Sequence, residues 1–222
     1  MKKITFAIIL VSAIIFSACK KDAVTNVVDP TAFNVSVVGK IVTVTNLPAD
    51  TIIGIGLMGP YGAGKYTFFS LRSNSIIART DSATSNWDIA FAGTKILINA
   101  GTSGPGNGGA FVYTQGNFDA LATIPVDSTF YIDNAPASYA ITYGSGKGWY
   151  NYDFPPVNII SAIPGRVLVI KTADGKYAKV EILNYYKGNT TPLSTATDSI
   201  KAYDSRYYSF RYTYQSNGTT TF

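Results

Sequence analysis

The sequence predicts an all-β fold, with a single antiparallel β domain of many short strands that follows a signal peptide and a tether. Short runs rich in β-branched and aromatic residues alternate between apolar and polar positions. Turn-forming residues recur between these runs about every 8–12 residues. No stretch has the apolar spacing of a helix longer than three turns. Hydrophobic residues make up 46% and charged residues 14% of the 222 residues, which excludes a disordered chain.

The N-terminus has the pattern of a signal peptide. A Met-Lys-Lys segment precedes 15 almost wholly apolar residues, 4–18. This apolar run is shorter than the ~20 residues that span a membrane. We therefore expect residues 1–18 to be removed during export.

Cys19 is the only cysteine, so an intramolecular disulfide is excluded. It follows Ser17 and Ala18, an order that resembles a bacterial lipobox, although Phe16 stands where a leucine-like residue is usual. We expect Cys19 to be acylated, palmitate included, and to anchor the protein in the lipid bilayer of the outer membrane. Residues 19–32 would then form a tether. The alternative is an ordinary secretory signal with an incidental cysteine.

Residues 33–222 are expected to form the β domain. Asp174-Gly175, between two apolar runs, predicts a β-hairpin because glycine accepts a positive φ. The aromatic residues of 207–214 alternate with polar ones, which predicts a strand with an aromatic inner face. The region Trp87–Ala110 is expected to form one long strand, a glycine-rich loop and a returning strand. The other expected strands are 35–38, 41–45, 166–171 and 176–183, with short helical turns within 117–123 and 193–202.

The composition excludes several kinds of catalytic and metal site. The chain has no histidine, and Glu181 is its only glutamate. A histidine-dependent triad, a histidine-ligated zinc site and a histidine general base are therefore excluded. Asp88, between two large apolar residues, is expected to be a buried structural carboxylate, with a general base as the alternative. We predict that the protein is not an enzyme; the enzymatic alternative is a metal-independent hydrolase.

Two glycine-rich segments match nucleotide-binding patterns only in part. Residues 59–65 fit the start of a P-loop, but Tyr66 stands where Ser or Thr should bind Mg²⁺, and a strand is expected next instead of a helix. Residues 104–109 fit G-x-G-x-x-G, again before an expected strand. We interpret both as loops, the second with several glycines at positive φ. The net charge is +5 and the basic residues are scattered, so we expect no nucleic acid partner.

Several segments between residues 65 and 215 share their order and spacing with a known family. They are Tyr66–Leu71, Ser85–Phe91, Gly101–Ala110, Arg166–Val180 and the closing aromatic strand. These segments resemble the HmuY-like haem-binding lipoproteins of Gram-negative anaerobes, whereas residues 33–62 have no counterpart. The resemblance implies a lipid-anchored all-β domain that captures haem with two axial His or Met side chains from loops in its second half.

The chain departs from this family at the ligand positions. It has no histidine, and Met58, the only methionine after the signal, lies in the unmatched part. One ligand loop would correspond to residues 149–156, where Phe154 occupies the ligand position, and a phenyl ring cannot coordinate iron. The other would lie within residues 132–148. Ligation by two histidines or two methionines is therefore excluded.

Tyrosine is a known type of haem ligand, and both loops contain it. The resemblance therefore gives, as candidates for contact with haem, Tyr139, Tyr143, Tyr150 and Tyr152, with Lys147 near the propionates. The alternative is that these tyrosines pack in the fold with their hydroxyls at the surface.

Two functions remain open from the sequence. The first is a non-enzymatic, outer-membrane-anchored lipoprotein that captures haem or another tetrapyrrole, with an outer-membrane receptor as a candidate partner. The second is a surface module that binds a glycan, a peptide or a partner protein through exposed aromatic residues, without haem.

The sequence also contains candidate O-glycosylation sites. Five aspartates are followed by Ser or Thr, a modest excess over chance. With an apolar third residue, such triplets resemble the acceptor of a general O-glycosylation system of exported bacterial proteins. Ser82 and Ser199 lie in the most polar stretches and are the expected acceptors. The alternative is turn chemistry, in which the Asp carboxylate accepts a hydrogen bond from a nearby amide.

Overall fold

The computed structural model describes residues 29–222, so the expected signal peptide 1–18 and the expected acylation site Cys19 lie outside the described residues. The predicted all-β fold is confirmed, because antiparallel strands dominate this part of the chain. The strands are β1 (Asn34–Val38), β2 (Ile41–Pro48), β3 (Gly54–Gly56), β4 (Gly59–Tyr61), β5 (Thr67–Ser70), β6 (Ser75–Ile77), β7 (Ile89–Ala92), β8 (Lys95–Ile98), β9 (Gly109–Tyr113), β10 (Tyr150–Asp153), β11 (Ile159–Ala162), β12 (Val167–Lys171), β13 (Tyr177–Tyr186) and β14 (Ser205–Gln215).

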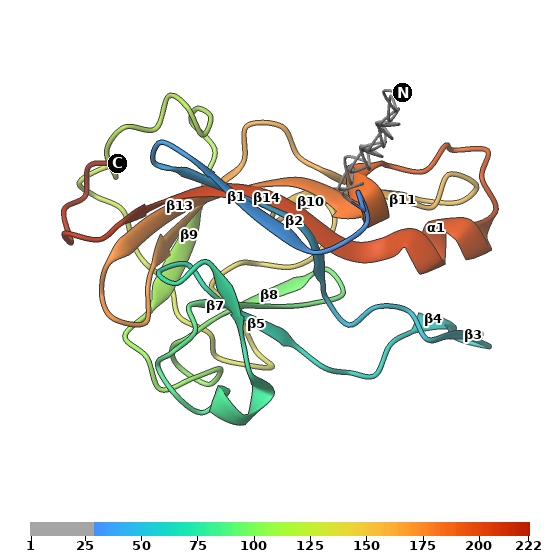
Figure 1. Ribbon diagram of the computed structural model, residues 1–222, viewed down its shortest axis with the longest axis horizontal. Coiled ribbons are helices and arrows are strands. Elements are labelled where there is room, and N and C mark those ends of the chain that lie inside the picture. Colours follow the sequence, from blue (N-terminus) through green and yellow to red (C-terminus); the bar gives the residue numbers. More distant parts are fainter. Residues whose placement is uncertain (1–28) are drawn as a thin grey trace, which may run out of the picture.

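Two antiparallel sheets pack face to face (Figure 1). The larger sheet has the order β1-β2-β14-β13-β12-β9, and the smaller has the order β6-β5-β7-β8. Phe69 and Phe91 of the smaller sheet meet Phe210 of the larger one, with ring centroids 5.5 and 5.4 Å apart. The pairs β3–β4 and β10–β11 form separate hairpins. The main core therefore lies between the two sheets.

The local signals read from the sequence correspond to observed elements. Gly175, with φ of +79°, turns the chain between β12 and β13 as predicted. In β14, Tyr208, Phe210 and Tyr212 are fully buried, so the predicted aromatic inner face is confirmed. The expected strands 35–38 and 41–45 are β1 and β2, which pair through the turn at Gly39.

The single long strand expected at the start of Trp87–Ala110 is wrong. The chain reverses at Gly93, which has φ of +55°, so β7 and β8 form an antiparallel hairpin in which Ala92 pairs with Lys95. The two-residue turn interrupts an otherwise continuous apolar pattern. The returning strand is β9, which joins the larger sheet beside β12.

The glycines of the 104–109 loop are not at positive φ, so the expectation that they provide positive φ angles is wrong. They are required by close approach instead. A Cβ on Gly104 would collide with the side chain of Asn99 and lie 2.7 Å from the Trp87 ring. A Cβ on Gly106 would lie 2.6 Å from the Asn99 carbonyl oxygen. The loop therefore lies directly against Trp87, before β7, and Asn99, after β8.

Helical structure in the described residues is short. The helix α1 (Asp198–Asp204) overlaps the expected turn within 193–202, and the side chain of Thr197 caps it by accepting from the Ile200 amide at 3.3 Å. Residues 117–123 contain a hydrogen-bonded turn but no helix. The 3-10 helices are η1 (Arg79–Asp81) and η2 (Lys187–Asn189). None of the helices between residues 29 and 222 is long and apolar enough to cross a membrane.

The end of the expected tether is held against the sheet. The buried Asn46 donates from Nδ2 to the carbonyl oxygens of Pro30 and Ala32, at 2.7 and 3.1 Å. Its Oδ1 accepts from the Gly188 amide at 2.7 Å. The attachment of the chain to the sheet therefore begins by Pro30, before the expected boundary at residue 33.

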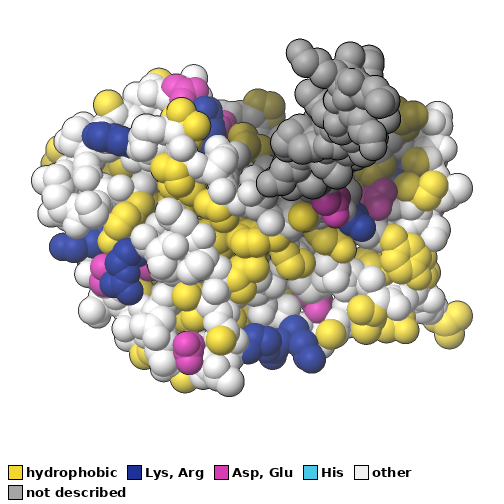
Figure 2. Space-filling model, viewed as in Figure 1, with side chains coloured by type: hydrophobic (Ala, Val, Ile, Leu, Met, Phe, Trp, Pro, Cys, Tyr) yellow, Lys and Arg dark blue, Asp and Glu magenta, His cyan; other side chains and the backbone are white. Residues whose placement is uncertain are grey.

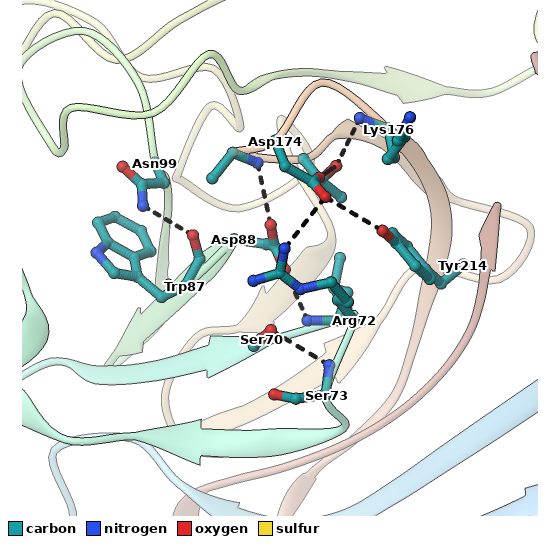
Figure 3. Close-up of polar contacts among 12 residues, drawn as sticks. Ser70, Arg72, Ser73, Trp87, Asp88, Asn99, Asp174, Lys176 and Tyr214 are labelled. Atoms are coloured by element: carbon teal, nitrogen blue, oxygen red, sulfur yellow. Dashed lines mark hydrogen bonds and ion pairs between the residues drawn. The ribbon is translucent and has the colours of Figure 1, made fainter. Parts of the chain in front are cut away.

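Asp88 is the buried structural carboxylate that the sequence predicts (Figure 3). It accepts from the amide of Leu71 at 2.8 Å and from the amide of Ala173 at 3.0 Å. Burial raises the pKa of its carboxyl more than these two hydrogen bonds lower it. Beside it, Arg72 pairs with Asp174 at 3.4 Å. These contacts join the end of β5 to the β12–β13 turn, and hence one sheet to the other.

Candidate functional site

A cleft of about 740 Å³ lies on the outer face of the smaller sheet. Because side chains alternate along a strand, Phe68 of β5 and Leu97 of β8 face outward while their neighbours fill the core. These two residues form an apolar floor, with the buried Trp87 and Ala90 packed against it. The cleft is lined by Tyr66, Phe68, Ser82, Ala83, Leu97, Gly101, Thr102, Ser103, Gly104, Pro105, Ala135 and Tyr139.

Residues 101–105 form a glycine-rich wall of the cleft. This wall is positioned by Asn99, which is fully buried. Its Nδ2 donates to the Trp87 carbonyl oxygen at 2.7 Å (Figure 3) and to that of Thr84 at 2.9 Å. Its Oδ1 accepts from the Gly106 amide at 2.9 Å. One side chain thus connects the segment before β7 with the loop that follows β8.

A second wall of the cleft adjoins the first, because the Thr102 amide donates to the Asp133 carbonyl oxygen at 2.9 Å. It is positioned by the side chain of Asp133, which is 1% exposed. Its Oδ2 accepts from the Ile98 amide at 2.9 Å, and its Oδ1 accepts from the Ala140 amide at 2.8 Å. Both carboxylate oxygens are therefore used to attach residues 133–140 to β8. This attachment places Tyr139 at the cleft.

Tyr139 and Tyr143 lie together around Lys95 of β8. Their ring centroids are 5.5 Å apart, and Lys95 Nζ lies 4.7 Å from the first and 5.1 Å from the second. Lys95 Nζ also donates to the Tyr139 hydroxyl at 3.3 Å. Burial lowers the pKa of Lys95, but the phenols of Tyr139, Tyr66 and Tyr143 together raise it more, so the net shift is upward. The lysine is therefore a charged group beside the cleft at neutral pH.

The structure places Tyr150 and Tyr152 apart from this group. Tyr150 is buried against Trp149, with centroids 4.9 Å apart, and its hydroxyl accepts from the Gly144 amide at 3.2 Å. Tyr152 donates from its hydroxyl to Asn158 Oδ1 at 2.7 Å and lines a different pocket of about 290 Å³. Neither lines the large cleft.

The remaining predicted residues lie at the surface or at the edge of the cleft. Lys147 and Phe154 are exposed, and the Lys147 carbonyl oxygen accepts from Arg166. Ser82 is half-buried and lines the cleft, while its carbonyl oxygen accepts from the Trp87 indole at 2.9 Å. Ser199 is exposed in the first turn of α1.

Sequence reasoning missed Lys95 and the apolar floor. The alternation in 95–99 contained part of the signal, because Lys95 and Leu97 fall on one face of β8 while Ile96 and Ile98 fall on the other. Nothing local indicated that Tyr139 would return to this face. In the described residues, no group of three or more His, Cys, Asp or Glu side chains is arranged to hold a metal ion. The cleft offers a ligand apolar surface, two phenols and the hydroxyl-bearing residues Ser82, Thr102 and Ser103, with the Lys95 ammonium beside it.

Comparison with protein families gives a match to the HmuY protein family over residues 63–197, which includes every residue that lines the cleft. Comparison with curated proteins gives no match.

Three solved structures are similar in part. A candidate lipoprotein from Bacteroides fragilis has a TM-score of 0.48 and 16% identity, covering 80% of this chain and 91% of that one. A candidate HmuY-like haem-binding protein from Bacteroides vulgatus has a TM-score of 0.46 and 16% identity, covering 78% and 91%. The apo HmuY analogue of Tannerella forsythia has a TM-score of 0.41 and 14% identity, covering 83% and 97%.

Proposed function

Because the chain belongs to the HmuY family, we propose that it is a non-enzymatic binding lipoprotein that captures haem or another tetrapyrrole in the cleft. The observation that carries this proposal is the coincidence of the family match with the cleft, from Tyr66 to Tyr139. A volume of about 740 Å³ falls within the ~300–1,000 Å³ typical of small-molecule sites. The apolar floor of Phe68 and Leu97 suits the face of a flat macrocycle.

The ligands for a haem iron differ from the His and Met pairs that the sequence resemblance implies. Met58, the only methionine among the described residues, is fully exposed at the tip of the β3–β4 hairpin. Among the four candidate tyrosines, Tyr139 lines the cleft and Tyr143 lies beside it. The hydroxyls of Tyr150 and Tyr152 are engaged elsewhere. Tyr139 and Tyr143 are therefore the first candidates for contact with the macrocycle.

Titration with haemin tests this function. We expect a shifted, saturable Soret band without a bis-histidine spectrum, because the chain contains no imidazole. Tyr139→Phe and Tyr143→Phe are expected to change the spectrum. Tyr152→Phe is the matched control, because its hydroxyl lies in the other pocket. Absence of a saturable change in the wild type would contradict the proposal.

Membrane attachment is proposed through acylated Cys19. This proposal is supported by the Ser17-Ala18-Cys19 sequence at the end of the apolar run of the expected signal peptide. We expect Cys19→Ala to move the protein from the outer-membrane fraction to the soluble fraction. Mass spectrometry of the native protein should show an acylated N-terminus, and an unmodified one would refute the anchor.

A second function, binding of a partner protein through exposed apolar residues, is favoured by the β3–β4 hairpin. Leu57 and Met58 at its tip are fully exposed, and Ile55 and Tyr61 are about half exposed. Figure 2 shows apolar side chains projecting at this end of the molecule. A photo-crosslinker at Met58 in the native host should give one discrete protein adduct, whereas one at the exposed Asn217 should not. Lack of an adduct at Met58 would remove this alternative.

A further inference from the structure

We propose that the cleft recognises a carboxylate of its ligand through Lys95, so that binding does not require a metal at the centre of the ligand. This inference rests on the proposed function, since it names the chemical group by which a tetrapyrrole would be held. It differs from capture by axial ligands, because the recognised group is at the edge of the macrocycle.

The first observation is the surroundings of Lys95. Its Nζ lies over the rings of Tyr139 and Tyr143 and donates to the Tyr139 hydroxyl. No carboxylate of residues 29–222 lies within ion-pair distance of it. Asp133, which attaches the segment of Tyr139 to β8, has both oxygens occupied by main-chain amides. Lys95 is therefore a half-buried cation without an acidic partner in this part of the chain.

The second observation is its position. Lys95 and Leu97 are two residues apart on β8, so both side chains point to the outer face of the smaller sheet. Tyr139, which accepts from Lys95, lines the cleft, and so does Tyr66, whose phenol lies close enough to raise the pKa of Lys95. The ammonium thus lies at the margin of an apolar floor. That arrangement fits a ligand with a flat apolar body and an acidic group at its edge.

The third observation concerns the alternatives for holding a macrocycle. The described residues contain no imidazole, and their one thioether is at the exposed tip of the β3–β4 hairpin. The phenol of Tyr139 is already paired with the ammonium. The Lys95 ammonium, which reaches the margin of the cleft at Tyr139, is a charged hydrogen-bond donor, and such donors form bonds about twice as strong as neutral ones. A tetrapyrrole without iron should therefore bind with an affinity similar to that of haemin.

The test compares protoporphyrin IX, which is metal-free and carries two carboxylates, with its dimethyl ester, delivered from the same detergent solution. Binding is followed by porphyrin fluorescence. The variants are Lys95→Met and Lys95→Arg, with Lys40→Met as the matched control because Lys40 is exposed in the β1–β2 turn. Circular dichroism verifies that each variant is folded.

We expect the wild type and Lys40→Met to bind the free acid within threefold of haemin and at least ~10-fold more tightly than the ester. Lys95→Met should lose about 10-fold in affinity for the free acid and little for the ester, and Lys95→Arg should restore most of the loss. Equal binding of the free acid by folded Lys95→Met and wild type would overturn the inference and leave the proposed function standing. Binding of haemin without binding of protoporphyrin IX would also overturn the inference and leave the proposed function standing. Failure of the wild type to bind either compound would overturn both.

Discussion

Replacement of Asp133 by Asn is expected to destabilise the wall of the cleft that contains Tyr139. The Asp133 carboxylate is 1% exposed and accepts from two main-chain amides, those of Ile98 and Ala140, at 2.9 and 2.8 Å. Hydrogen bonds to a charged group contribute about 1.5–3 kcal/mol each, and a buried donor without a partner costs about 1–3 kcal/mol. An Asn side chain has one acceptor oxygen and would direct its NH₂ at the other amide. We therefore expect Asp133→Asn to lower the free energy of unfolding by about 2–4 kcal/mol.

Urea denaturation followed by circular dichroism measures this change, and amide hydrogen exchange shows where it occurs. Exchange should accelerate at Ile98 and Ala140 before it does in the core of the larger sheet. Asp127→Asn is the matched control, because Asp127 is exposed and its carboxylate accepts no hydrogen bond in the described residues. A loss of less than about 0.5 kcal/mol for Asp133→Asn, the range of an ordinary surface substitution, would refute the assigned role.

Three further predictions concern other parts of the chain. Gly104→Ala should lower the free energy of unfolding, measured by thermal unfolding, by about 1–3 kcal/mol, because its Cβ would collide with buried side chains. Gly56→Ala is the control and should lower this free energy much less, because its Cβ would meet only ordinary contacts. Asp88→Asn should lower the free energy of unfolding more at pH 3 than at pH 7, as measured by urea titrations at both pH values. The pKa of the Asp88 carboxyl is raised in the folded protein above the unfolded value of 3.8, so the wild type loses stability as pH rises from 3.8 through the folded-state pKa. O-glycosylation at Ser199 and Ser82 should appear as intact mass beyond the lipidated polypeptide in protein from the native host and should be lost in the Ala variants. Ser199 is the more accessible acceptor.

The strands that could be predicted are those whose signal is local. The Asp174-Gly175 turn and the aromatic alternation of β14 each depend on a few adjacent residues. The β7–β8 hairpin was missed because its turn at Gly93 is short and lies inside one apolar pattern. The glycine-rich segment 104–109 is recognisable as a loop from the sequence. The reason why glycine is needed there is close contact with Asn99, which only the folded chain reveals.

The candidate site could not be predicted in the same way, because its contacts join distant segments. The hydrogen bond from Lys95 to Tyr139 spans 44 residues, and that from Ile98 to Asp133 spans 35. Family resemblance identified Tyr139 and Tyr143 as candidates but grouped them with Tyr150, whose hydroxyl is bonded to the main chain of its own loop. The sequence neighbours of Tyr139, which lines the cleft, and of Tyr150, which is buried, do not distinguish the two environments. The partner of the hydroxyl separates them, and for Tyr139 that partner is Lys95, a lysine at the margin of the cleft.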